Sequence, residues 1–146
     1  MGKKRSNKLK QLGHLPPQHS FFLNPYTDAR FTRCPQCDGK TKLRKKPLLI
    51  FITPQQPVSL NKTCRYCPYC DLLIAHKNEL DQLLQKMCLQ LFPHLVGQDY
   101  LVVGTIERKT WKEGKASVED IFKSLHDFKR HLEFEPSHYV WVKDDS

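Results

Sequence analysis

Two short cysteine motifs of the same form constrain this chain more than any other feature. Cys34-Pro35-Gln36-Cys37-Asp38 and Cys67-Pro68-Tyr69-Cys70-Asp71 are both Cys-Pro-x-Cys-Asp, and they lie far apart in the chain. Two thiolates separated by two residues can face one ion when the chain between them turns tightly. Two such turns supply four sulfur ligands, which suit a tetrahedral Zn²⁺ ion. Because four thiolates leave no coordination position for water, we expect one zinc ion with a structural role.

The ligand set has alternatives within the sequence. Cys64 precedes Cys67 by the same spacing, so these two residues form a rival second motif. We favour Cys67 with Cys70 because that pair repeats the form of the first motif, and His76 is a less favoured ligand. Cys88 lies among the apolar positions of a predicted helix, where a cysteine is typically a core residue.

Residues 31–76 resemble a zinc ribbon, a module in which two Cys-x2-Cys turns are joined by β-strands. The first turn is Cys34/Cys37 and the second is Cys67/Cys70. The resemblance covers about a third of the chain and implies a local β fold around the metal. Zinc ribbons occur in transcription factors, ribosomal proteins, polymerase subunits and adaptors, so the resemblance leaves the function open.

The pattern of apolar residues predicts an α+β chain with three parts. Residues 1–28 are a basic tail that we expect to be flexible. Residues 29–76 are the zinc-ribbon β module, with three strands. Residues 77–146 are a small α+β part packed on that module. The predicted strands of the module are 48–53, 58–66 and 71–75.

The third part begins with an amphipathic helix and continues as a β-α-β arrangement. The helix covers residues 77–92, with Asn78 and Asp81 in the capping-box positions. A second helix begins at Ser117, with Asp120 in the matching position, and its apolar spacing continues to Leu132. The other predicted elements are a strand at 99–108, a turn at 111–114 and a strand at 138–142.

Positive charge is concentrated in the first third of the chain. The net charge of the 146 residues is +9. Residues 1–46 hold twelve Lys and Arg against two Asp, a net charge of +10, which leaves −1 for residues 47–146. Such asymmetry is typical of proteins that bind a polyanion, most often a nucleic acid.

Aromatic residues are interleaved with the basic ones, as in proteins on whose rings unpaired bases stack. In an extended segment, Lys40, Lys42 and Arg44 would share one face. The predicted nucleic-acid contacts are Lys3, Lys4, Arg5, Arg30, Arg33, Lys40, Lys42, Arg44, Lys45, Lys46, Tyr66 and Tyr69.

These features predict a small cytoplasmic zinc-binding protein that binds nucleic acid, RNA in preference to DNA, through its basic N-terminal third. The alternative is a zinc-ribbon adaptor that binds another protein and no nucleic acid. No apolar run is long enough to span a bilayer, and no signal-peptide pattern follows the basic start, so we expect no membrane association. The sequence has no catalytic motif, so we expect neither an enzyme nor a small-molecule substrate. A cluster of His131, Glu133 and His138 would be the weaker, enzymatic alternative.

Overall fold

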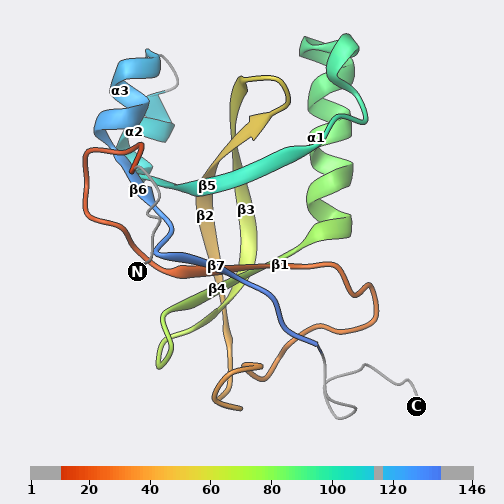
Figure 1. Ribbon diagram of the computed structural model, residues 1–146, viewed down its shortest axis with the longest axis vertical. Coiled ribbons are helices and arrows are strands. Elements are labelled where there is room, and N and C mark those ends of the chain that lie inside the picture. The colour runs from red at the N-terminus through yellow and green to blue at the C-terminus, as the bar shows by residue number, and fades with distance from the viewer. Residues whose placement is uncertain (1–10, 114–116, 136–146) are drawn as a thin grey trace, which may run out of the picture.

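The computed structural model describes residues 11–113 and 117–135, and one sheet contains all of its named strands (Figure 1). The strands are β1 (Ser20–Asn24), β2 (Lys42–Ile52), β3 (Gln56–Cys67), β4 (Leu72–His76), β5 (Tyr100–Ile106), β6 (Leu125–Asp127) and β7 (Arg130–Leu132). The helices are α1 (Lys77–Leu91), the 3-10 turn η1 (Pro93–Leu95), α2 (Arg108–Glu113) and α3 (Val118–Lys123).

The strand order is β6-β5-β2-β3-β4-β1-β7, and the sheet curls on itself. Its two ends, β6 and β7, are separated in sequence by only Phe128 and Lys129. The two ends therefore have to lie close together. Residues before β1 complete the closure, because the N–H of Gln18 donates to the carbonyl of Asp127 (2.9 Å) and the N–H of Lys129 donates to the carbonyl of His19 (2.7 Å).

Two glycines permit the close approach of β6 to its neighbours. A Cβ atom at Gly13 would lie 2.1 Å from the carbonyl oxygen of Leu125, and one at Gly104 would lie 2.1 Å from that of His126. Both distances are far below van der Waals contact. Any side chain at either position would push β6 away from the chain beside it.

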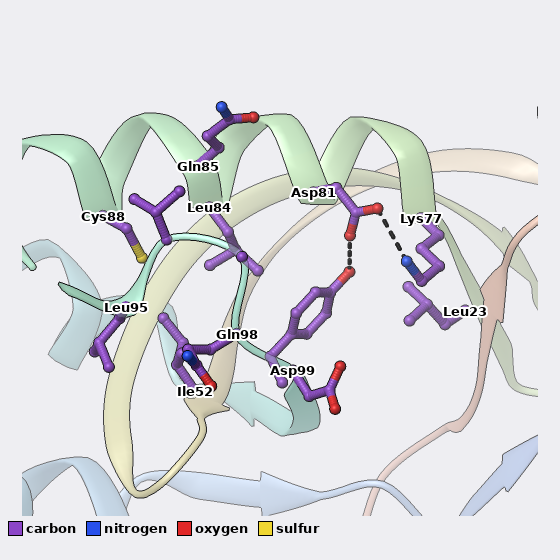
Figure 2. Close-up of a pocket in the computed structure, with 13 residues that line it drawn as sticks. Leu23, Ile52, Lys77, Asp81, Leu84, Gln85, Cys88, Leu95, Gln98 and Asp99 are labelled. Carbon is purple, nitrogen blue, oxygen red and sulfur yellow. Dashed lines mark hydrogen bonds and ion pairs between the residues drawn. The ribbon is translucent and has the colours of Figure 1, made fainter. Parts of the chain in front are cut away.

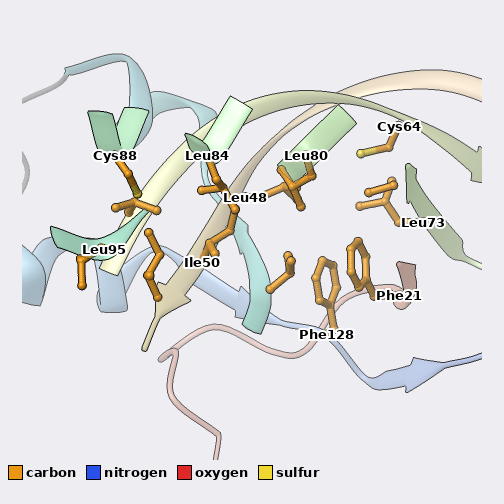
Figure 3. Packing of buried hydrophobic residues seen from close by; sticks show 14 residues of the cluster. Phe21, Leu48, Ile50, Cys64, Leu73, Leu80, Leu84, Cys88, Leu95 and Phe128 are labelled. Carbon is orange, nitrogen blue, oxygen red and sulfur yellow. The ribbon is translucent and has the colours of Figure 1, made fainter. Parts of the chain in front are cut away.

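The main core lies between α1 and one face of the sheet (Figure 3). Helix α1 buries Leu80, Leu84 and Cys88, which recur every four residues and so share one face of the helix. They pack against alternate residues of β2, among them Leu48 and Ile50. At the closure, the rings of Phe21 and Phe128 stack with centroids 4.4 Å apart.

The α+β class is confirmed, but the division into three parts is not. β2 and β3, which belong to the predicted zinc module, are the central strands of a sheet that also contains β5, β6 and β7. The predicted tail is too long, because residues 20–24 form β1, which pairs in parallel with both β4 and β7. Residues 1–10 of the predicted tail lie outside the described residues.

Within the C-terminal part, some predictions are confirmed and others are wrong. Helix α1 ends at Leu91 as expected, but its N-cap is His76 rather than Asn78. The capping box of Ser117 and Asp120 is present, yet α3 ends at Lys123, and residues predicted to continue that helix form β6 and β7. The predicted turn at 111–114 begins within α2, and the predicted strand at 138–142 lies outside the described residues.

Candidate metal centre

Four cysteine side chains from the two motifs converge on one point. The Sγ atoms of Cys34, Cys37, Cys67 and Cys70 all lie within 4.8 Å of one another. Cys34 and Cys70 have their sulfurs 3.9 Å apart, and Cys37 and Cys67 have theirs 3.5 Å apart. Sulfurs bound at about 2.3 Å to a tetrahedral ion lie about 3.8 Å apart. The four thiols therefore fit a single metal ion, and none of them is in a disulfide.

Each cysteine pair lies in a tight turn that the following aspartate closes. Asp38 and Asp71 both adopt the left-handed backbone conformation, with φ of 65° and 55°. Aspartate is among the few residues that tolerate this region. In the first turn, the N–H groups of Gln36 and Gly39 donate to the sulfurs of Cys34 and Cys37, both at 3.3 Å. These bonds disperse the negative charge that metal-bound thiolates carry.

The centre is buried on one side and exposed on the other. Cys34 and Cys67 are buried and pack with Phe22 and Phe31, whereas Cys37 is exposed. Burial raises the pKa of the Cys34 thiol, while the N–H of Gly39 lowers that of Cys37. A bound cation would favour the thiolate at all four positions.

Cys64 lies outside the cluster of four sulfurs, whereas Cys70 belongs to it, which agrees with the preferred set of cysteines. The Cys64 side chain faces the main core beneath α1, where its sulfur lies 3.5 Å from the carbonyl of Lys62. Burial raises its pKa to about 12, which keeps this thiol protonated. His76 is also outside the cysteine cluster, and Cys88 is a core residue as expected.

The cations predicted to contact nucleic acid lie at the same end of the sheet as the cysteines. We call this end, residues 29–46 and 62–71, the metal end; it lies at the bottom of Figure 1. Among the predicted nucleic-acid contacts at the metal end, Lys46 and Tyr66 are partly buried. The exposed cations are Arg30, Arg33, Lys40, Lys42, Arg44 and Lys45. Lys3, Lys4 and Arg5 lie outside the described residues.

The basic residues of β2 are divided between two faces of the sheet. Lys42 lies opposite Tyr66 and Arg44 opposite Cys64, so these two cations share a face as expected. Lys45 belongs to the other face, and Lys40 precedes the strand. Arg65 was missed by sequence reasoning: it is partly buried and lies opposite Leu43. Arg65 lies between Cys64 and Tyr66 in the strand, and neighbouring residues of a strand face opposite sides of the sheet. This alternation would have placed Arg65 on the same face as Lys45.

Tyr69 and Tyr66 differ in exposure and in their contacts. Tyr69 is 81% exposed on the second cysteine turn, and a Cβ atom at Gly39 would lie 3.2 Å from its ring. The Tyr69 ring therefore reaches from the second cysteine turn to Gly39 of the first turn and remains largely exposed. Tyr66 instead donates its hydroxyl hydrogen to Asp71 (2.6 Å), so it has a structural contact.

A separate cavity of about 430 Å³ lies between α1 and the residues that lead into β5 (Figure 2). Its floor includes Ile52 and Leu84. Three of its polar side chains are paired with one another, because Asp81 accepts hydrogen bonds from Tyr100 (2.6 Å) and Lys77 (2.9 Å). Burial and the hydrogen bond to Asp81 raise the pKa of Tyr100, so its phenol stays protonated. The cavity is distant in sequence from the cysteine turns and contributes no ligand to them.

In comparisons with protein-family models, with curated proteins and with solved structures, nothing matches this chain. None of the helices in residues 11–113 and 117–135 combines the length and hydrophobicity of a bilayer-spanning segment. The conclusions about function therefore rest on the geometry above.

Proposed function

We propose that this is a zinc-binding protein of the cytoplasm that holds nucleic acid, RNA in preference to DNA, at its metal end. It acts by binding rather than as an enzyme. The observation that carries the proposal is a group of exposed cations that form no ion pair within residues 11–113 and 117–135, next to the cysteine cluster and an exposed aromatic ring.

Zinc is the ion that this ligand set suits best. Thiolates are soft ligands, and a tetrahedral set of four sulfurs is typical of Zn²⁺ or of iron–sulfur chemistry. The two Cys-x-x-Cys turns have the ligand spacing of structural zinc sites. Reduced cysteines in such clusters are typical of the cytoplasm, which supports that compartment. Metal analysis of the purified protein tests the identity of the ion, and one zinc per chain is the expected result.

The exposed cations carry more positive charge than is needed to balance the negative charge of the metal centre. Four thiolates and one divalent cation leave a charge of −2. Six cations are exposed at the metal end, and within the described residues none of them forms an ion pair. The excess positive charge therefore remains available for a polyanion, and phosphate contacts of this kind supply most of the affinity of nucleic-acid binding.

The exposed ring of Tyr69 favours an unpaired strand. One edge of this ring lies beside Gly39, and Tyr69 is 81% exposed, so the ring offers an accessible surface on which a base can stack. Bases stack on such rings when they are not paired, and sequence-specific RNA recognition commonly uses unpaired bases. The combination supports single-stranded RNA over duplex DNA.

A charge-matched pair of double variants tests the proposal. We expect Lys42→Ser with Arg44→Ser to weaken binding of a single-stranded RNA and to reduce the slope of log affinity against log salt by about 1.4, or ~0.7 per lost phosphate contact. Lys86→Ser with Lys123→Ser removes the same charge from the exposed surfaces of α1 and α3 and should leave the slope unchanged. Equal effects of the two double variants, or no affinity of the wild type at low salt, would contradict the proposal.

A protein-binding adaptor is the second candidate, because α1 exposes Leu83, Leu89 and Leu91. Exposed apolar side chains on one helix are typical of protein contacts when they form a continuous patch. Recovery of one stoichiometric protein that resists nuclease and high salt would favour this candidate over nucleic-acid binding.

A further inference from the structure

A pocket of about 220 Å³ opens between β3 and β4 at the metal end. The two strands pair only from Arg65 to Cys67 with Leu72 to Ile74, and their separation beyond this point opens the pocket. This volume is smaller than the ~300–1,000 Å³ of pockets for drug-sized ligands. It suits one planar ring system. The lining is formed by Asn24, Arg30, Leu43, Thr63, Cys64, Arg65, Ile74, His76 and Glu79.

The pocket combines an apolar wall with cations. Leu43 and Ile74 supply aliphatic surface, and Leu43 is 58% exposed although it is a large apolar residue. Arg30 and Arg65 also line the pocket, and neither forms an ion pair within the described part of the chain. Glu79 brings one negative charge, but its carboxylate already accepts a hydrogen bond from the buried ammonium of Lys62 at 2.8 Å.

His76 brings an unused acceptor to the same place. Its Nδ1 is buried and has no hydrogen-bond partner among the described residues. Its Nε2 lies 3.4 Å from the carbonyl oxygen of Thr27, which can only accept, so we assign the proton of the neutral ring to Nε2. Nδ1 is then an acceptor without a donor. His76 is the N-cap of α1 but makes no side-chain capping bond, so the helix does not use this atom either.

Asn24, another polar side chain of the pocket, already forms hydrogen bonds within the chain. Its amide donates to the carbonyl of Ala29 (2.7 Å), and its oxygen accepts from the N–H of Tyr26 (2.9 Å). Arg30 and Arg65 are therefore the charged groups of the pocket that form no ion pair within the described residues.

We propose that this pocket holds one unstacked base of a bound single-stranded nucleic acid. The inference rests on the proposed function and adds the site where a base is recognised. The base packs against Leu43 and Ile74, beside the side chain of His76. Arg30 and Arg65 contact the phosphates on either side of that nucleotide.

The test uses short single-stranded RNA with the fluorescent base 2-aminopurine at one position, moved along the strand in a series of oligonucleotides. We expect the wild-type protein to change the fluorescence strongly at one position, where the base enters the pocket. Thr63→Phe fills the pocket without changing charge. It should abolish that fluorescence change and lower the affinity about tenfold, within the range for loss of one stacked base.

Two controls keep the outcomes separate. Gln55→Phe places the same ring on the exposed turn between β2 and β3 and should behave like the wild type. If Thr63→Phe fails to fold, judged by zinc content and thermal unfolding, Leu43→Ser at the exposed rim should give the same loss of signal. Unchanged fluorescence responses in the folded pocket variants would overturn the pocket but leave nucleic-acid binding intact. Absence of any RNA binding by the wild type would overturn both proposals.

Discussion

Asp71 links the second cysteine turn to the closure of the sheet. Its carboxylate accepts hydrogen bonds from Tyr66 (2.6 Å), His19 (2.5 Å) and Lys129 (3.1 Å). These contacts come from β3, from the residue before β1 and from the residue before β7. Burial alone would raise the pKa of Asp71, but the hydrogen bonds outweigh it and lower the pKa to about 2.

Asp71→Asn is expected to destabilise the protein. Asparagine tolerates the left-handed backbone at this position, so the turn should keep its shape. The loss of charge-assisted hydrogen bonds should lower the free energy of unfolding by about 1–3 kcal/mol, measured by urea denaturation. Asp38→Asn is the matched control, because Asp38 has the same backbone conformation and its exposed carboxylate makes no hydrogen bond within the described residues. Equal effects at the two positions would show that the contacts of Asp71 are unimportant.

Variants at Cys70 and Cys64 should differ in the amount of metal that they bind. Cys70→Ala removes a ligand and should cause loss of the bound metal. Cys64→Ala removes a core thiol and should keep the metal while lowering stability by about 1 kcal/mol. Metal content per chain and thermal unfolding of both variants check this. Metal retained by Cys70→Ala and lost from Cys64→Ala would refute the ligand assignment.

At the residue scale, the four ligands could be predicted because both turns carry the same local pattern. The choice against Cys64 became certain only with β3 in place, since its strand position directs its side chain into the core. The base-sized pocket could not be predicted. It depends on where β3 and β4 diverge, which is a property of two strands and not of any motif.

At the element scale, α1 is tied to β3 through a buried cation. The ammonium of Lys62 donates to Glu79 in the first turn of α1 and to the carbonyl of Thr63 at 2.7 Å. Lys62 is only 5% exposed, whereas the Glu79 side chain is about half exposed. An inward-pointing lysine on a strand with a partly unpaired edge also discourages pairing with other chains.

This contact should make stability depend on pH in acid. The hydrogen bond from Lys62 lowers the pKa of Glu79, so the ionised carboxylate stabilises the folded state. The contribution is fully present above the unfolded-state pKa of about 4.3 and is lost as pH falls through the lower folded-state value. Glu79→Gln should therefore be less stable than the wild type at pH 7, by no more than about 1 kcal/mol because the group is half exposed. The difference should begin to shrink as the pH falls below about 4.3 and should vanish once the pH is below the lowered folded-state pKa. A difference that stays constant between pH 3 and pH 7 would contradict this linkage.

Helix α1 was predictable and the end of α3 was not, for opposite physical reasons. The apolar positions of α1 meet the core at helical spacing, so pattern and packing agree. After Lys123 the apolar spacing still permits a helix, but the hydroxyl of Ser124 bonds back to the carbonyls of Asp120 and Ile121. The following residues then pair with β5 and β1. Tertiary strand pairing overrides a local helical pattern in such cases.

At the scale of the whole molecule, the metal centre is part of the sheet rather than a separate module. The cluster around Cys34 and Cys67 includes Phe22 of β1, and Phe134 after β7 packs against it. The N–H of Ser20 donates to the carbonyl of Asp71 (2.9 Å). β1 could not be predicted as a strand, because its short apolar run finds its partners only at distant positions of the chain.

Removal of the metal should therefore affect β1 and β7 as well as the cysteine turns. We expect chelation to increase hydrogen exchange of the backbone amides in residues 20–24 and 130–132, while the amides of α1 keep most of their protection. Hydrogen-exchange mass spectrometry before and after chelation measures this. A change confined to residues 32–41 and 66–72 would show that the centre is an autonomous module.

The pairing of β7 with β1 has a consequence for synthesis of the protein. A ribosome releases β1 early, but the strand that covers its outer side emerges only after almost the whole described chain has been translated. β5 is likewise without β6 until the same late moment. A nascent chain thus carries the outer edge of β1 unpaired until residues 130–132 are made, and the outer edge of β5 unpaired until residues 125–127 are made. Such edges are templates for pairing with other chains. Vectorial folding therefore cannot complete this part of the sheet from its N-terminus, because β1 and β5 both need strands that are translated after residue 124.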